Sequence, residues 1–219
     1  MQFLAQHMIV IMPKRMQQAD GVRTAAHHDP VADRAGNVLA SSHSDTMRPG
    51  PEMQLVHEPD EPAPVCEYGR SKAAAEARLI DAGCDALIVR TSAFFGPWDR
   101  YNFLFDTVAR LKRGEEVVAS DRDIVSPTYV PDLVHATLDL LLDEKKGIWH
   151  LTSQGAVSWH DLACEAADRA KASRGLIRAA QDSPGADNSM TSRRGLLLRP
   201  LGDALTDFFE HSETLRELT

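Results

Sequence analysis

From Glu67 onward the chain alternates between amphipathic segments and short apolar runs, and this alternation constrains the fold more than any other feature. SKAAAEARLIDAG is rich in alanine and straight-chain residues and ends at Gly83, which predicts a helix with a glycine stop. The ALIV run that follows is short, apolar and bounded by turn residues, as expected for a buried strand of a parallel sheet.

The same alternation continues toward the C-terminus. Amphipathic patterns predict helices in NFLFDTVARLKRG, after SPTYV, in SWHDLACEAADRAKAS and in LGDALTDFFEHSETLREL, and apolar runs predict strands in EEVVAS and GIWHLTS. Ser158 is the expected N-cap of its helix, because a serine hydroxyl accepts a hydrogen bond from a free backbone N–H. Together these elements predict an α/β fold with a mainly parallel sheet.

The N-terminal part of the chain carries weaker signals. HMIVIM fits a short buried strand, whereas the residues after it, up to Gly36, show no sustained period of two or of about 3.6. Residues 41–64 are rich in Ser, Pro and Asp, and prolines remove backbone donors and restrict the residues before them. This composition predicts an extended loop ahead of the first strong helix.

Charge and cysteine content exclude several classes of protein. The 219 residues carry 24 basic and 32 acidic side chains, a net charge of −8, which argues against broad contact with nucleic acid or an anionic membrane. Three unequally spaced cysteines suit a reducing compartment better than a disulfide framework. No apolar run approaches the roughly 20 residues of a membrane helix, and the opening stretch lacks the charge order of a secretory signal. We therefore expect a cytoplasmic protein.

Tyr68 and Lys72 form the pair with the clearest chemical potential. They stand four residues apart at the start of a predicted helix, so their side chains share one face. An ammonium near a phenol favours the phenolate and brings a pKa that starts at about 10 toward a useful value. Such a tyrosine can give its proton to a carbonyl oxygen while hydride arrives at the carbon. On spacing alone, a surface helix with a solvated lysine is the more common explanation.

Several segments, taken together, indicate a family. YGRSKAAAE resembles the YGxSKxxxE signature of extended short-chain dehydrogenase/reductases, and specifically of the dTDP-4-dehydrorhamnose reductase family. LIVRTSAFFGP, DIVSPTYVPDLVHAT and GIWHLTSQGAVSWHDLACEAA are similar to later segments of that family, in the same order, and SRRGLLLRPLGDALTDFF is similar to its closing segment. The resemblance covers about residues 41–210 and implies an incomplete Rossmann-like parallel sheet flanked by helices, with a small C-terminal α/β substrate-binding region.

The resemblance also implies an activity. It is the reduction, by NADPH or NADH, of the C4 ketone of a nucleotide-activated 4-keto-6-deoxysugar, as in dTDP-rhamnose biosynthesis. Tyr68 would donate the proton, and Lys72 would tune Tyr68 and hydrogen-bond the ribose of the nicotinamide, which makes both of them catalytic and cofactor-binding residues. The implied partner is a sugar-nucleotide substrate, with no nucleic acid, membrane or metal, and a homodimer is the candidate assembly.

A third catalytic position comes from the family's STDYVFDG stretch. Counting back 24 residues from Tyr68 reaches Ser44, which is followed by Asp45. The resemblance implies that Ser44 orients the substrate ketone and that both residues contact the substrate. Ser41 or Ser42 are alternative counterparts of the family's hydroxyl residue, and a plain loop serine is the other explanation of Ser44.

Two positions depart from the family pattern. The tryptophan of the family's RTSW segment belongs to the sugar-nucleotide pocket, and this chain has Ala93 there. Phe94 or Phe95 are candidate sources of apolar surface, and an altered substrate is the alternative explanation. The GxxGxxG loop that lets a dinucleotide pyrophosphate approach a helix N-terminus is also missing, since residues 1–43 contain only Gly21 and Gly36. An alternative hypothesis is therefore a truncated, non-catalytic sugar-nucleotide-binding or regulatory paralogue. A sequence whose true start lies upstream is a third explanation.

These patterns predict three regions. Residues 1–40 form a divergent N-terminal segment, residues 41–125 the remainder of a dinucleotide-binding domain, and residues 126–219 a substrate-binding region. His160 and Cys164, spaced as neighbours on one helix face, would supply only half of a zinc site, so we expect an ordinary helix there. His27 and His28 lie in an unpatterned stretch and are expected to be solvated.

Overall fold

The computed structural model of the chain describes residues 6–11, 31–32, 38–43, 56–63, 67–180 and 185–212. For the first three of these ranges it describes the backbone alone. None of the helices in these ranges is both long enough and apolar enough to cross a bilayer.

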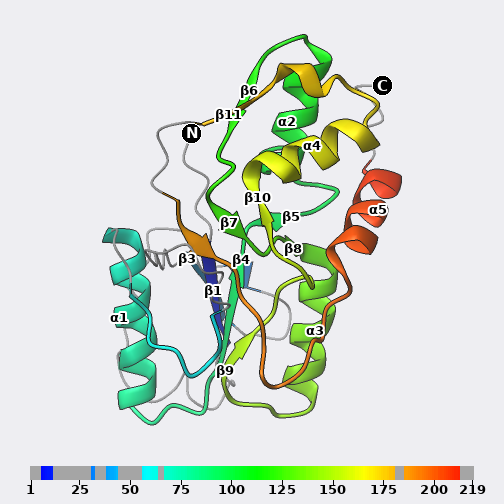
Figure 1. Cartoon of the computed structure of the whole chain (residues 1–219). Helices are drawn as coiled ribbons and strands as arrows, with labels where there is room; N and C mark the ends of the chain where they lie inside the picture. The colour runs from blue at the N-terminus through cyan, green and yellow to red at the C-terminus, as the bar shows by residue number, and fades with distance from the viewer. Residues whose placement is uncertain are drawn as a thin grey trace.

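The largest sheet has five strands in the order β2-β3-β1-β4-β9 (Figure 1). The strands are β1 (Gln6–Ile11), β2 (Val31–Ala32), β3 (Val38–His43), β4 (Leu87–Ser92) and β9 (Gly147–His150). The predicted α/β, Rossmann-like fold is confirmed, and β4 and β9 run parallel, with Leu87 opposite Gly147. HMIVIM forms a strand as predicted, but β1 runs antiparallel to both β3 and β4, so the described sheet is mixed. β3 also extends to His43, where the composition predicted a loop.

Two helices cover opposite faces of this sheet. Figure 1 shows α1 (Glu67–Asp81) on one side and α3 (Val130–Leu142) on the other. β4 is buried along its whole length because its side chains alternate between the two helices. Leu87 and Val89 pack in a cluster with Leu133 of α3, whereas Ile88 packs on the α1 side.

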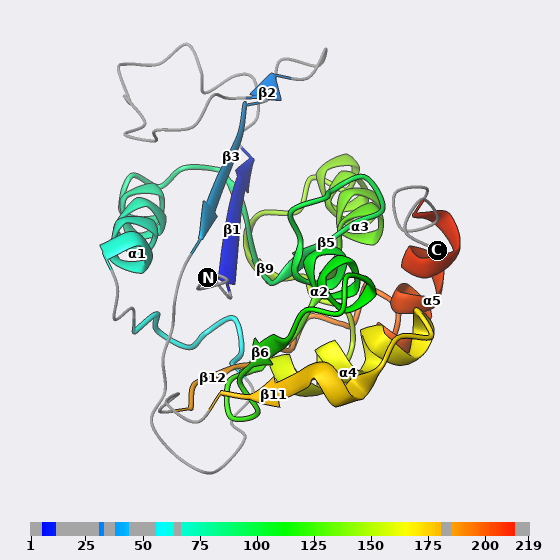
Figure 2. The same cartoon turned by 90° about the horizontal axis from the view of Figure 1, so that it is seen from above.

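The remaining elements form a second group of layers above the sheet. Its helices are α2 (Phe103–Lys112), α4 (Trp159–Arg169) and α5 (Leu201–His211), with a 3-10 turn at Arg174–Leu176. Two strand pairs and a three-stranded sheet complete it. The pairs are β6 (Val117–Ala119) with β11 (Ile177–Ala179) and β5 (Phe94–Phe95) with β8 (Thr128–Tyr129). In the three-stranded sheet, β7 (Ile124–Val125) lies between β10 (Val157–Ser158) and β12 (Asp187–Asn188). Figure 2 shows β12 beside the segment that runs toward α1.

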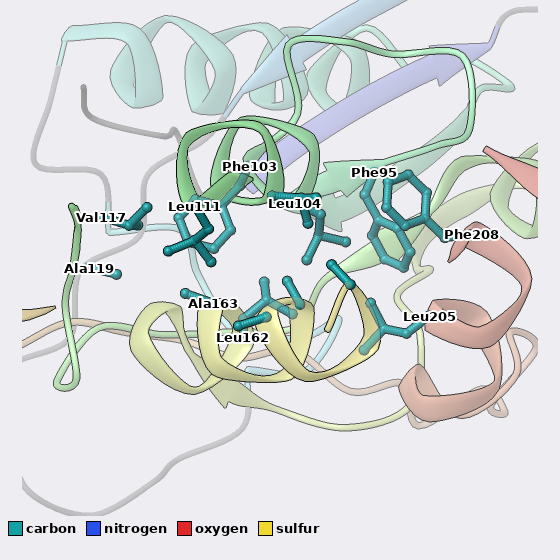
Figure 3. Packing of buried hydrophobic residues seen from close by; sticks show 14 of the residues in the cluster. Phe95, Phe103, Leu104, Leu111, Val117, Ala119, Leu162, Ala163, Leu205 and Phe208 are labelled. Atoms are coloured by element: carbon teal, nitrogen blue, oxygen red, sulfur yellow. The ribbon is translucent and has the colours of Figure 1, made fainter. Parts of the chain in front are cut away.

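One large apolar cluster joins α2, α4 and α5 of this second group. Figure 3 shows leucines of α2 and α4 facing each other, with Leu104 and Leu111 above Leu162. Phe95 completes the cluster against Phe208 of α5, their ring centres 5.6 Å apart in an edge-to-face arrangement. The predicted cap of α4 is confirmed, because the Ser158 hydroxyl accepts a hydrogen bond from the Asp161 N–H at 3.0 Å.

Candidate active site

Tyr68 and Lys72 lie together on the first turns of α1. The Lys72 ammonium nitrogen is 4.9 Å from the centre of the Tyr68 ring, and both side chains are half-buried. Burial lowers the pKa of the Lys72 ammonium from its ordinary value, since removing a charge from water disfavours the charged form. A partly desolvated cation against an aromatic ring stabilises negative charge on that ring more strongly than a solvated one. The arrangement can therefore support proton donation by the Tyr68 phenol.

A buried ion pair fixes the helix that carries these residues. Arg90 of β4 donates from Nε to Glu76 Oε2 at 3.0 Å and from a terminal nitrogen to Glu76 Oε1. Both residues are buried, with 8% and 5% of their surfaces exposed. Glu76 lies one helical turn beyond Lys72, so this bidentate pair sets the position of α1 against β4. The pairing of these two residues was not predicted, although a charged residue directly after the apolar LIV run is an unusual signal.

Arg90 also reaches the loop before α1 and the neighbouring strand. Its Nη1 group donates to the carbonyl oxygen of Asp60 at 3.2 Å and lies 3.4 Å from Nε2 of His150. The other ring nitrogen of His150 is 3.0 Å from the carbonyl oxygen of Thr191. Burial, and then the charge of Arg90, lower the pKa of His150. A neutral imidazole that donates to Thr191 and accepts from Arg90 satisfies both contacts.

Glu58 joins the same network to the C-terminal part of the chain. Its carboxylate accepts hydrogen bonds from the Ser192 hydroxyl, from the Arg193 N–H at 3.0 Å and from the His150 N–H at 3.3 Å. Burial alone would raise the pKa of Glu58, but hydrogen bonds, with those from Ser192 and Arg193 the largest, outweigh it and lower the pKa to about 2. The carboxylate thus ties the segment before Tyr68 to residues 192 and 193.

The Glu58 carboxylate makes the free energy of unfolding depend on pH in the acidic range. The folded-state pKa of Glu58 is about 2, and its ordinary value is 4.5. The ionised carboxylate therefore stabilises the folded state fully above pH 4.5, and this stabilisation is lost as the pH falls toward 2. The difference corresponds to roughly 3 kcal/mol. Urea unfolding across this pH range should show a smaller loss of stability in Glu58→Gln than in the parent chain. Glu61→Gln, at an exposed position of the same loop, is the control and should behave as the parent does. Equal pH dependence in Glu58→Gln and the parent would contradict the assignment.

Of the predicted substrate-binding residues, the structure describes Ala93 but not Ser44 or Asp45. Ser44 and Asp45 lie outside the described residues, directly after the last residue of β3. The alternatives Ser41 and Ser42 lie in β3, paired with Ile9 and Met8 of β1.

Ala93 directly follows β4 and is buried. Its backbone has φ 36°, a left-handed conformation uncommon for a residue with a side chain, and its side chain packs in a cluster with Val125. The suggestion that Phe95 supplies apolar surface to a pocket is wrong, because Phe95 is 2% exposed and packs between Tyr129 and Phe208. Phe94 packs against the cluster of α3 and β4, because successive strand residues point to opposite faces.

Other candidate metal ligands lie elsewhere in the chain. Cys164 and His160 are neighbours on α4, with 3.9 Å between Sγ and Nδ1. His27 and His28 lie outside the described residues. Within the described ranges, one group of three side chains has metal-ligand spacing: Asp207, Glu210 and His211 of α5. Arg199 already donates to Asp207 at 2.7 Å in that group.

Comparison with known proteins identifies the family. Residues 15–194 match the family model described as RmlD substrate binding domain. The chain is 33% identical over 132 residues to the dTDP-4-dehydrorhamnose reductase of Aggregatibacter actinomycetemcomitans, which covers 57% of this chain and 42% of that protein. It is 38% identical over 106 residues to the dTDP-4-dehydrorhamnose reductase of Mycolicibacterium smegmatis, covering 48% of this chain and 32% of that protein.

A solved structure shows the same relationship. The dTDP-4-dehydrorhamnose reductase of Bacillus anthracis, in complex with NADP, superposes with a TM-score of 0.64 at 26% identity, covering 74% of this chain and 61% of that chain. The chain spans half or less of the length of the two curated relatives. The family model covers most of the chain, and the predicted family is confirmed. The two curated relatives named above are dTDP-4-dehydrorhamnose reductases. The chain therefore belongs to the RmlD substrate binding domain family.

Proposed function

We propose that this chain carries the proton-donating and sugar-nucleotide-binding part of a reductase. The reaction is the transfer of hydride from NADPH or NADH to the C4 ketone of a nucleotide-activated 4-keto-6-deoxysugar. The observation that carries the proposal is the contact between Lys72 and Tyr68 on α1. Membership of a family with relatives named dTDP-4-dehydrorhamnose reductase supports the substrate class.

Each residue has a defined task in this proposal. Tyr68 gives its phenolic proton to the C4 oxygen, so that ketone, NAD(P)H and one proton become alcohol and NAD(P)⁺. Lys72 stabilises the phenolate left behind and hydrogen-bonds the nicotinamide ribose. Ser44 orients the ketone, and Asp45 and Ala93 contact the sugar nucleotide. The cofactor supplies the hydride when bound, and the protein supplies position and charge.

The residues of the chain fit one end of the dinucleotide. Tyr68 and Lys72 suit the nicotinamide ribose, because a phenol and an ammonium meet on one helix face. The 219 residues contain no GxxGxxG segment to receive the pyrophosphate. A second candidate function is a non-catalytic sugar-nucleotide-binding or regulatory paralogue, which would not need that segment. For either function we also propose the boundaries near residues 40 and 125, a homodimer and a sugar-nucleotide ligand.

Titration with NADPH and with dTDP separates the two candidates. The reductase proposal predicts that NADPH binds and is oxidised when dTDP-4-keto-6-deoxyglucose is added. The paralogue proposal predicts binding of dTDP without binding of NADPH at up to millimolar concentration. Saturable NADPH binding would contradict the paralogue proposal, and its absence would contradict a reductase activity of this chain.

A further inference from the structure

We propose that the side-chain carbonyl of Asn188 accepts a hydrogen bond from the bound sugar nucleotide, an inference that rests on the proposed function. Asn188 lies on β12 and is 5% exposed. In the described part of the chain its Oδ1 atom is buried and has no hydrogen-bond partner. Buried polar atoms in folded proteins are nearly always paired, because an unpaired one loses its bond to water without replacement.

The unpaired acceptors gather at this strand. The neighbouring Asp187 uses Oδ1 to accept from the N–H and hydroxyl of Ser189, while its Oδ2 atom is buried and unpaired. The other buried side-chain atoms of the described residues that lack a hydrogen-bond partner belong to helices, namely Thr107 and Arg110 of α2 and Thr137 of α3. Among the strands whose side chains the structure describes, β12 alone carries buried acceptors without a hydrogen-bond partner.

The position of β12 links both parts of the candidate site. Asn188 pairs with Val125 in a parallel register, so the two side chains share a face of the short sheet. Val125 packs against Ala93, the position that the resemblance assigns to the sugar-nucleotide pocket. The residue after β12, Ser189, contacts the segment that leads to α1 (Figure 2). Its carbonyl oxygen accepts a hydrogen bond from the N–H of Val56 in that segment at 3.0 Å.

The chemistry of the acceptor selects part of the ligand. A carbonyl oxygen needs a donor, and a sugar nucleotide offers donors as sugar hydroxyls and as the N–H of the base. Its diphosphate offers only acceptors at neutral pH and cannot be the partner of this atom. The contact is therefore made by the sugar or by the nucleoside.

Asn188→Leu tests the proposal because it should lower the affinity for the ligand without lowering the stability of the free chain. The leucine has similar volume and no polar atoms, so the free chain should keep or raise its thermal unfolding midpoint. Its affinity for dTDP-glucose should fall about tenfold or more. Thr137→Val is the matched control, since it removes another buried unpaired atom, on α3, and should leave affinity unchanged.

Calorimetric titration with dTDP and with dTDP-glucose completes the test. A loss of affinity for both ligands places the donor on the nucleoside, and a loss for dTDP-glucose alone places it on the sugar. Unchanged affinity in Asn188→Leu, with the parent binding, would overturn this inference and leave the proposed function standing. A lowered unfolding midpoint would assign Asn188 a structural role and overturn it as well. A parent chain that binds neither ligand would overturn the proposed function, and this inference with it.

Discussion

Replacing Tyr68 with phenylalanine is expected to lower the rate of ketone reduction by about 10³-fold. The substitution removes only the hydroxyl, so the ring and its contact with Lys72 remain, while the proton for the C4 oxygen has no donor. Affinity for dTDP should stay within about twofold, because the phenol acts on the reacting atoms. Steady-state turnover and equilibrium dTDP binding, measured on the same preparation, check both parts of the expectation.

Tyr101 provides the matched control for this substitution. It is 91% exposed in the loop before α2, so Tyr101→Phe changes the same atom at a position without a proposed role. Turnover of Tyr101→Phe should equal that of the parent. If Tyr68→Phe retained parental turnover, Tyr68 would have no part in the reaction.

Arg90→Met is expected to cause the largest loss of stability, about 3–5 kcal/mol. It leaves the buried Glu76 carboxylate without its partner and also removes the donor to the Asp60 carbonyl. Replacing both members of the pair, as Arg90→Met with Glu76→Leu, should recover part of this loss because no buried charge is left alone. Urea unfolding followed by circular dichroism measures both free energies.

An exposed ion pair serves as the comparison for the buried one. Arg113 donates to Glu115 at 2.7 Å, and both side chains are about half exposed, so Arg113→Met should change stability little. A loss in Arg90→Met no greater than that in Arg113→Met would contradict the role of Arg90 in holding α1.

Local patterns in the sequence predicted much of the fold. Alanine-rich and amphipathic segments gave the positions of α1, α2 and α4, because helix propensity and periodicity act over neighbouring residues. Ser158 was predicted as a cap for the same reason, since its partner Asp161 is three residues away. The Tyr68 and Lys72 contact also lies within one helical turn.

Features that depend on distant residues were not predictable in this way. The strand signal in HMIVIM contains no information on direction, and its antiparallel pairing with β3 and β4 is decided by tertiary structure. The sequence around Phe95 does not show which residues it contacts, because its partner Phe208 lies on the distant helix α5. The hydrogen bond from Ser192 to Glu58 joins residues far apart in the chain, which no local pattern reports.

The buried network gives the candidate site a physical connection between its parts. Glu76 and Arg90 fix the helix of Tyr68, and Arg90 contacts the loop whose Glu58 binds residues 192 and 193. A sugar nucleotide held near β12 would therefore be positioned by the same buried network that positions the proton donor Tyr68. Such a frame favours one fixed distance between ketone and phenol.

Transfer of deuterium from NADPH labelled at its hydride position tests the central claim most directly. The chain is mixed with labelled NADPH and dTDP-4-keto-6-deoxyglucose, and the sugar product is examined by nuclear magnetic resonance. We predict one deuterium at C4 for each NADPH oxidised, and its loss in Tyr68→Phe. Consumption of NADPH without deuterium at C4, or no consumption in the parent chain, would contradict the claim.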